Sequence, residues 1–341
     1  MSKLLVANTI AQAVAMGTAT PVRARTRDHM MTFDAQTVDS TGIFLVGELE
    51  RLDQTMHEPL VDVTWSRDID LRSDVSIADE VSSFSNASFA AAGGASPQGK
   101  SWVGKNADAI QGIALDIGKT AQPLTLWANQ IGWTIPELES ARQAGRPVDA
   151  LKHSGLILKH NMDTDEQVYI GDDVIGVQGL LNSDKVGATN VNKSWKLATA
   201  DEILADVNMI LYNAWVASGF AVCPTKLLLP PEQFGSMVTR KVSDAGNISI
   251  LEYVKINCIS YAKNGKPLDI QPSKWCVGRG TAGTDRMMCY TQSENRVRFP
   301  MVPLQRTPVE YRDLRQLTTY YGRLGAVEWV YPETAFYADG L

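Results

Sequence analysis

The sequence has few cysteines, few histidines and no long apolar run. Its 341 residues include four cysteines and four histidines. No two cysteines form a Cys-x-x-Cys pair, which excludes the common metal-finger and redox motifs, so we expect buried free thiols in a reducing compartment. No apolar run approaches the length of a membrane span, and we therefore expect no membrane partner.

Positive charge is also scarce. The formal net charge is −6, whereas broad affinity for nucleic acid needs a basic surface. Only the N-terminal segment is locally cationic, since Lys3, Arg23, Arg25 and Arg27 precede the first acidic residue, Asp28. This segment is either a solubilising tail or an arm that lies on an acidic neighbour or on packaged polyanion, and both interpretations stay open.

Two glycine motifs resemble phosphate-binding loops, but each lacks the required context. Gly278–Gly283 matches the G-x-G-x-x-G pattern, yet the residues that follow predict a strand and not the helix that a dinucleotide site needs. Gly118-Lys119-Thr120 lacks the glycine five positions earlier, where Ile113 stands, and Pro123 blocks a following helix. We therefore expect a hairpin turn at the first motif and reject the second.

The densest acidic cluster lies between positions 163 and 173. An EF-hand loop is excluded because Val168 stands where that loop needs glycine. A catalytic pair of carboxylates stays an alternative, although solvated helix faces and helix ends explain such clusters far more often. The cluster consists of Asp163, Asp165, Glu166, Asp172 and Asp173.

The histidines and serines do not assemble a catalytic or metal site by local spacing. His153 and His160 lie two turns apart on one predicted helix, without the i,i+4 spacing and third ligand of a helical zinc site, while His29 and His57 lie far away. No Gly-x-Ser-x-Gly elbow is present. The sequence therefore predicts a protein that is not an enzyme, with no catalytic, cofactor-binding or metal-binding residues.

The N-terminal 135 residues predict little core of their own. Residues 1–42 are polar and aperiodic, and residues 43–59 contain a short amphipathic helix. The alternation of Val61, Val63 and Trp65 with polar residues predicts a strand. A glycine-rich tip follows at 90–105, and a second β-rich run returns at 113–135 to complete a long hairpin. Such a long hairpin either packs on its own domain as an edge or lies against something else.

The remainder predicts a long helix followed by a globular lobe. An apolar stripe of mostly three- and four-residue steps runs from Pro147 to Tyr169, and Gly171 ends the helix. Thr199 and Ser249 each begin a capping-box pattern and open a helix. We expect strands at 227–229, 275–277, 287–291 and 296–299, and alternating strands in the last forty residues.

In order and spacing, these segments resemble the major capsid protein of tailed double-stranded DNA phages, whose Hong Kong 97-type shell fold is shared with encapsulins and herpesvirus capsid floors. The long helix that leads into Gly171-Asp172 is similar to the passage from the family's spine helix to its axial domain. Further stretches that resemble family blocks are 176–182, 224–234, 250–255, 285–290 and 325–340. The likeness runs from about residue 43 to the end.

The resemblance implies an α+β fold of the Hong Kong 97-like type with five parts. These are an N-terminal arm (1–42), a short helix (43–59), an extended loop with its return strands (60–135), a peripheral domain (136–175 and 291–341) and an axial domain (176–290). It also implies a structural subunit that self-assembles into an icosahedral capsid around the phage genome. An enzyme-loaded encapsulin shell and a hydrolase that uses Asp163–Asp173 are the alternatives.

The resemblance further implies the partners and the place of the protein. Many copies of the chain would form hexamers and pentamers around double-stranded DNA without sequence specificity, with portal, separate scaffolding and cement proteins as further partners. Assembly would take place in the host cytoplasm and the product would be the virion. Some family members cross-link a lysine to an asparagine; Lys100, Lys105 and Asn295 are candidates here, but we expect non-covalent locking.

Overall fold

The computed structural model describes residues 59, 61–91, 105, 112–144, 148–243 and 247–341. The chain divides into two compact units, Met1–Leu60 and Val61–Leu341, and the description concerns the second. The predicted arm (1–42) and most of the helix at 43–59 lie outside the described residues, as do most of the loop tip and the histidines His29 and His57.

A six-stranded sheet carries the long helix. Strand β13 (Arg315–Leu324) lies between β11 (Val297–Arg306) and β4 (Thr125–Thr134), antiparallel to both, and its hairpin partner β12 (Glu310–Arg312) also pairs with it. The register of β4 and β13 runs without interruption from Thr125 opposite Leu324 to Thr134 opposite Arg315. At the other edge, β11 pairs with β1 (Asp70–Arg72) in parallel and with β14 (Glu328–Trp329).

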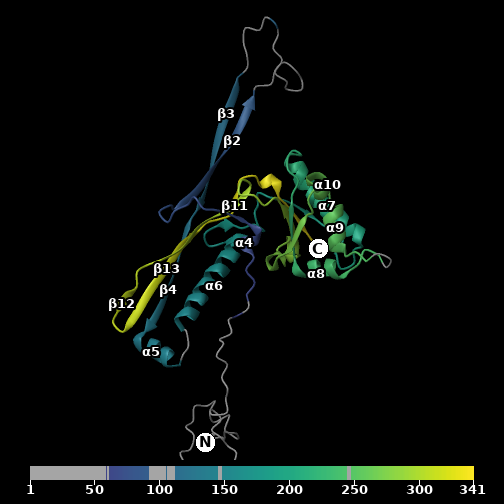
Figure 1. Ribbon diagram of the computed structural model, residues 1–341. Helices are drawn as coiled ribbons and strands as arrows, with labels where there is room; N and C mark the ends of the chain where they lie inside the picture. The colour runs from purple at the N-terminus through teal and green to yellow at the C-terminus, as the bar shows by residue number, and fades with distance from the viewer. Residues whose placement is uncertain (1–58, 60, 92–104, 106–111, 145–147, 244–246) are drawn as a thin grey trace, which may run out of the picture. The chain divides into compact units, whose positions relative to one another are not determined.

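Helix α6 (Val148–Tyr169) is the predicted long helix, and it packs along β4 (Figure 1). Its buried face includes Leu156, and Gly171 adopts a left-handed φ of 81° just after the helix ends. Its polar contacts reach the sheet as well, because Lys152 Nζ donates to Gly132 O at 3.0 Å and Gln167 Nε2 to Gly325 O at 3.1 Å. Two shorter helices flank α6, α4 (Trp65–Asp68) and α5 (Ile135–Ala144).

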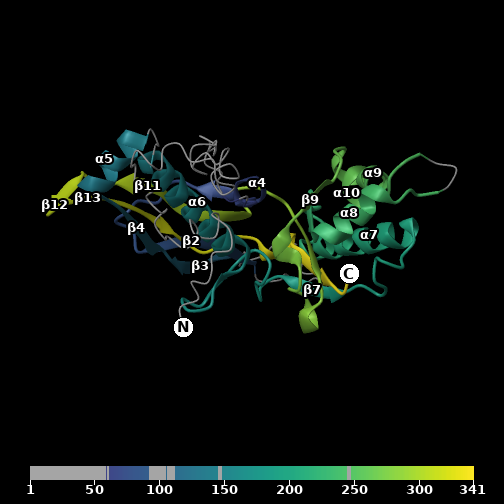
Figure 2. The same cartoon turned by 90° about the horizontal axis from the view of Figure 1, so that it is seen from below.

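A second sheet of five strands has the order β7-β15-β10-β8-β9. Helices gather on one side of it, as Figure 2 shows. The strands are β7 (Gly187–Asn190), β8 (Lys226–Leu229), β9 (Asp269–Pro272), β10 (Arg286–Tyr290) and β15 (Phe336–Asp339). The helices are α7 (Ala200–Ala217), α8 (Pro231–Thr239), α9 (Ile250–Asn257) and α10 (Ile259–Asn264), with short 3-10 turns η2 (Lys274–Cys276), η3 (Thr281–Gly283) and η4 (Pro332–Thr334).

The central strands of the five-stranded sheet, β8, β10 and β15, are buried on both faces, which explains the continuous apolar run of β8. In β8, Leu227 and Leu229 pack in the cluster of the helical side, whereas Leu228 packs in a second cluster. That second cluster also contains Val168 of α6 and Phe299 of β11. Alternate residues of one strand therefore join the helical lobe to the six-stranded sheet.

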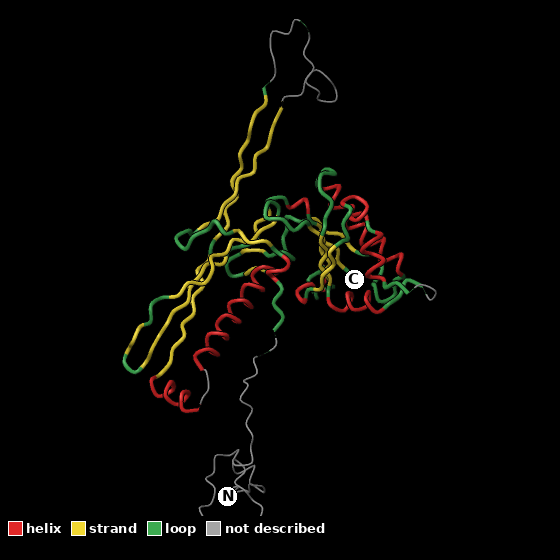
Figure 3. The backbone as a smooth tube through the Cα atoms, viewed as in Figure 1, coloured by secondary structure: helices red, strands yellow, loops and turns green. Residues whose placement is uncertain are grey.

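Two further pairs of strands complete the described part of the chain. Strands β2 (Val81–Ala91) and β3 (Ile113–Pro123) form a two-stranded antiparallel ribbon, drawn in Figure 3 as two long yellow strands side by side. Strands β5 (Gly171–Asp172) and β6 (Val177–Gln178) form a small hairpin after α6. Among the described residues, no helix combines the length and apolarity needed to cross a membrane.

Local predictions of helices and turns agree with this fold in most places. The helix to Tyr169, the strand at 227–229 and the capping box of Thr199 and Glu202 are confirmed. Two strand predictions are wrong: Val61–Ser66 contains no strand and leads into α4, and Trp275 lies in a 3-10 turn. The predicted β-rich run to residue 135 ends one residue early, because Ile135 begins α5.

Candidate assembly surface

The outer half of the β2–β3 ribbon carries an exposed apolar face. Residues directly opposite in an antiparallel pair point to the same side, and Phe89 pairs with Leu115 while Ala87 pairs with Ile117. Phe89 is 76% exposed, Leu115 55% and Ile117 63%. We call Ala87, Phe89, Ile113, Leu115 and Ile117 the apolar strip; the described residues leave it uncovered.

On the opposite face of the ribbon, the outer half carries polar residues and glycine. Ser88 pairs with Asp116, and Asn86 pairs with Gly118. All four residues are exposed. A two-stranded ribbon that is polar on one face and apolar on the other is only marginally stable in water. We therefore expect another protein surface to cover the apolar strip.

The base of the ribbon is anchored to the six-stranded sheet by a buried carboxylate. Glu328 of β14 is fully buried, and its side chain accepts hydrogen bonds from Ser82 Oγ and from Arg298 Nε, the latter at 2.7 Å. Arg72 Nη1 donates to Glu328 Oε1 at 3.1 Å and also to Ser83 O at 3.0 Å. We call Arg72, Ser82, Arg298 and Glu328 the root cluster; it bonds the base of the ribbon to the six-stranded sheet.

A second buried network joins α6 to the five-stranded sheet. Asp68 of α4 is fully buried and forms an ion pair with Lys226 Nζ of β8 at 3.0 Å. Tyr169 Oη at the end of α6 donates to Asp68, and Tyr290 Oη of β10 donates to Asp68 O at 2.5 Å. Burial alone would raise the pKa of Asp68, but the hydrogen bonds from Arg67 and Tyr169 and the charge of Lys226 lower it. We call Asp68, Tyr169, Lys226 and Tyr290 the junction cluster.

The acidic cluster of the sequence is divided among several structural tasks. Asp165 is buried and accepts from Thr64 N at 2.9 Å and from Trp275 Nε1 at 2.6 Å. Asp163 accepts from Trp127 Nε1 at 2.9 Å and pairs with Lys159. Hydrogen bonds that hold elements together thus occupy the buried carboxylate of Asp165 and the half-buried one of Asp163.

The remaining acids of the cluster lie at the rim of an open cavity of about 490 Å³ between α6 and the start of β4. Glu166 and Asp173 are exposed, and Asp172 accepts from Val174 N at 2.8 Å. In the part of the chain that the structure describes, no three His, Cys, Asp or Glu residues come together as metal ligands.

The two histidines of α6 have different surroundings. His160 is buried edge-on against Trp127, with ring centroids 4.9 Å apart, and burial lowers its pKa. His153 is exposed beside Tyr320, with ring centroids 5.4 Å apart. They pack on different partners and share no ligand in the described structure.

Neither glycine motif forms a phosphate-binding loop, but the hairpin turn predicted at the first is wrong, because the 3-10 turn η2 and not a strand precedes it. Gly278–Gly283 is a turn that leads into β10 and not into a helix, and Asp339 accepts hydrogen bonds from Thr281 N and Oγ1 there. Gly118-Lys119-Thr120 lies inside β3. All four cysteines are free and buried, as predicted.

The cross-link candidates are only partly described. Lys105 and Asn295 are exposed, and Lys100 lies outside the described residues.

The sequence did not predict the root cluster or the junction cluster, because single buried charges interrupt the apolar pattern without a period of their own. Local capping patterns, in contrast, were readable from the sequence.

Comparison with known proteins gives a family and a fold. The model of a family described as "Major capsid protein" matches residues 99–341. The capsid of Myoviridae phage XM1 has a TM-score of 0.74 at 15% identity, over 88% of this chain and 100% of that chain. The capsid of a native GTA particle computed with C5 symmetry has a TM-score of 0.56 at 12% identity, over 90% and 99%.

A structure from Gordonia phage Cozz has a TM-score of 0.52 at 12% identity, over 94% of this chain and 98% of that chain. Among curated proteins none matches. At these identities the solved structures show the fold, and they confirm the predicted α+β, Hong Kong 97-like architecture.

Proposed function

The chain belongs to the major capsid protein family and is a structural subunit of a capsid, and from this premise we propose that the apolar strip binds a neighbouring copy in the shell. The exposed side chains support this proposal, because burying a large apolar side chain stabilises a contact by about 1.5–3 kcal/mol. Repeated by symmetry, a modest contact of this kind is sufficient to hold many copies together.

We further propose a division of labour within the subunit. Residues 1–42 would form the arm, 43–59 the short helix and 60–135 the extended loop with its return strands. Residues 136–175 and 291–341 would form the peripheral domain, and 176–290 the axial domain. Because β15 pairs with β7 and β10, we propose one change to these bounds: Phe336–Asp339 belong to the axial domain and not to the peripheral domain.

The partners of the shell follow from its role as a genome container. We propose that the chain assembles in the host cytoplasm as hexamers and pentamers, with portal, scaffolding and decoration proteins encoded separately. Double-stranded DNA would be enclosed without sequence readout, in keeping with a net charge of −6. The family match favours this role over the enzyme-loaded compartment and over a hydrolase, and it supports a structural rather than catalytic subunit.

One substitution tests the role of the apolar strip. We expect Leu115→Asp to lower the yield of closed particles at least tenfold when the chain is expressed with its assembly partners, because the carboxylate would be buried at the contact. Ser88→Asp on the opposite, polar face is the matched control and should leave the yield within about twofold. Electron microscopy and sedimentation provide the measurement. Equal yields from both variants would refute the proposal.

A further inference from the structure

A buried histidine lies where α6 packs on β4, a contact that we call the α6–β4 seam. His160 is 5% exposed, and its Nε2 atom is buried without a hydrogen-bond partner in the described structure. Its ring meets Trp127 of β4 edge-on, with centroids 4.9 Å apart. Buried polar atoms without a partner are rare in folded proteins, so this nitrogen calls for an explanation.

Two side chains of α6 bind the same tryptophan. Besides the ring of His160, Asp163 Oδ2 accepts from Trp127 Nε1 at 2.9 Å, and Asp163 also pairs with Lys159. Burial lowers the pKa of His160, and the charge of Asp163 and a hydrogen bond with Asn161 only partly oppose this effect. The imidazole is therefore neutral in the closed seam at neutral pH.

The sheet side of the seam supplies no counter-charge for an imidazolium. Alternate residues of β4 from Trp127 to Trp133 and of β13 from Thr318 to Leu324 lie on the side that faces α6. The only titratable group among them is Tyr320, which lies against His153, two turns before His160 on the helix. A protonated imidazole donates from both nitrogens, so protonation would leave a buried charge and a buried N–H without an acceptor.

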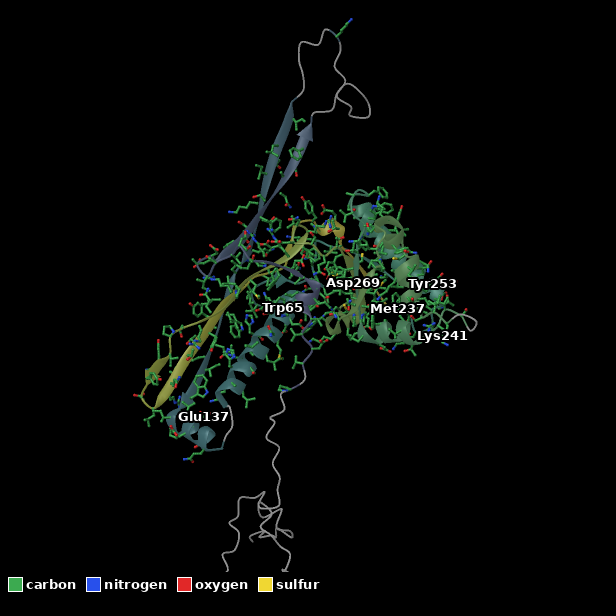
Figure 4. The ribbon with its side chains drawn as sticks, in the orientation of Figure 1. Trp65, Glu137, Met237, Lys241, Tyr253 and Asp269 are labelled. Carbon is green, nitrogen blue, oxygen red and sulfur yellow. The ribbon has the colours of Figure 1, made fainter. Side chains whose placement is uncertain are left out.

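The other charged contacts of α6 lie toward the two ends of the helix. Lys152 Nζ binds Glu137 Oε1 of α5 at 2.6 Å, and Asp165 Oδ1 accepts from Trp65 N at 3.0 Å. Figure 4 labels Glu137 near one end of α6 and Trp65 near the other. His160 lies between these contacts in the sequence, so its protonation acts on the middle of the seam.

The seam lies close to the base of the ribbon. Strand β3 leads through a single buried residue, Leu124, into β4, and Trp127 follows three residues later. Leu124 N donates to Glu80 O at 2.9 Å, and Arg323 Nη1 donates to Leu124 O at 2.8 Å. A change in the contact between α6 and Trp127 is therefore a change beside the point where the ribbon joins the sheet.

We propose that His160 is a pH switch in the fold: as a neutral imidazole it packs on Trp127 and closes the α6–β4 seam, and as an imidazolium it loosens the seam at the base of the ribbon. This inference concerns the folded subunit and does not depend on the proposed function. In the opened seam His160 binds a proton near the ordinary histidine pKa of about 6.5, and in the closed seam only at lower pH. The seam is therefore most stable above about pH 6.5 and loses stability as the pH falls below that value.

Hydrogen exchange of the unassembled full-length chain at about pH 7.5 and about pH 5.5 tests the switch. The results are compared as protection factors, because these remove the pH dependence of the chemical exchange step. In the wild type, the amides of β4 near Trp127 and of α6 near His160 should lose about three- to tenfold in protection at the lower pH, the ceiling being set by a pKa of about 6.5 in the opened seam.

Two variants assign the effect to one histidine. His160→Phe keeps a ring against Trp127 but cannot be protonated, so its protection should change less than about twofold between the two pH values. His153→Gln is the matched control, since His153 is exposed on the same helix, and it should lose protection as the wild type does. Equal protection of the wild type at both pH values would overturn the proposal. A loss that persists in His160→Phe, or that disappears in His153→Gln, would overturn it as well.

A measurement on the wild type covers the case in which His160→Phe does not fold. Exchange of the imidazole C2 hydrogen, followed by mass spectrometry, gives the pKa of His160 without a substitution. A value below about 6.5 supports the switch, and a value at or above it overturns the switch. Both measurements use unassembled chains, so failure of particles to form, which would refute the proposed function, is observed separately.

Discussion

The root cluster makes a sharp prediction, because one arginine binds two carboxylates of opposite exposure. Arg72 Nε lies 2.6 Å from Asp74 Oδ1, and Arg72 Nη1 lies 3.1 Å from Glu328 Oε1. The Asp74 side chain is 66% exposed, whereas that of Glu328 is fully buried. Substituting each carboxylate by its amide removes one charge at nearly constant shape. The two variants therefore differ only in the environment from which the charge is lost.

Glu328→Gln should be the costly change. It leaves Arg72 and Arg298, whose side chains are only 15% and 19% exposed, without a buried counter-charge. Breaking a buried ion pair on one side costs about 3–5 kcal/mol, so we expect the free energy of unfolding to fall by about 3 kcal/mol or more. Asp74→Asn breaks an exposed pair and should cost at most about 1 kcal/mol.

Denaturant unfolding of the unassembled chain measures both values, and hydrogen exchange locates the effect. In Glu328→Gln the amides of β2 near Ser82 should exchange faster than in Asp74→Asn, because one of the two oxygens that accept from Ser82, Arg72 and Arg298 becomes an amide donor. Equal destabilisation by both variants would show that the buried carboxylate does not anchor the ribbon.

Two further predictions concern acid stability and the end of α6. Asp339 accepts a hydrogen bond from Arg286 at 2.7 Å. Burial alone would raise the pKa of Asp339, but the hydrogen bonds from Arg286 and Thr281 lower it. The pKa of Asp68 is lowered by its hydrogen bonds and ion pair in the same way. The stabilisation by Asp339 is therefore present above the unfolded pKa of about 3.9 and is lost as the pH falls through the lower folded value. In urea unfolding, we expect Asp339→Asn to be less stable than the wild type at pH 7, and the difference should shrink by about pH 3. A difference that stays constant with pH would contradict this. Gly171 and Gly176 both have left-handed φ values, but a Cβ at Gly171 collides with Val177 O while one at Gly176 meets open space. In thermal melting we expect Gly171→Ala to lower the free energy of unfolding by several kcal/mol and Gly176→Ala by about 1 kcal/mol. Similar losses in both variants would refute the close approach at Gly171.

The sequence predicted the elements whose signals are local. The stripe of α6, the capping box of α7 and the leucine run of β8 each depend on neighbours a few positions apart, and all three are confirmed. A similar signal before α5 was present but overlooked: Glu137 N donates to Thr134 Oγ1 at 3.3 Å and Thr134 N to Glu137 Oε2 at 3.4 Å, which is the Thr-x-x-Glu pattern that predicts a helix start.

Elements whose form depends on distant partners were not predictable in the same way. The Val61–Trp65 alternation suggested a strand, yet Asp165 accepts hydrogen bonds from the backbone of Thr64 and Trp65, and α4 begins there. Those bonds join residues about a hundred positions apart in sequence. Tertiary hydrogen bonds of this kind override a local alternation, because alternation measures exposure and not backbone pairing.

The same reasoning explains why the apolar strip was foreseen only in outline. That the ribbon lacks a core followed from its composition, but the face that is apolar follows from register, since Phe89 opposite Leu115 puts both rows on one side.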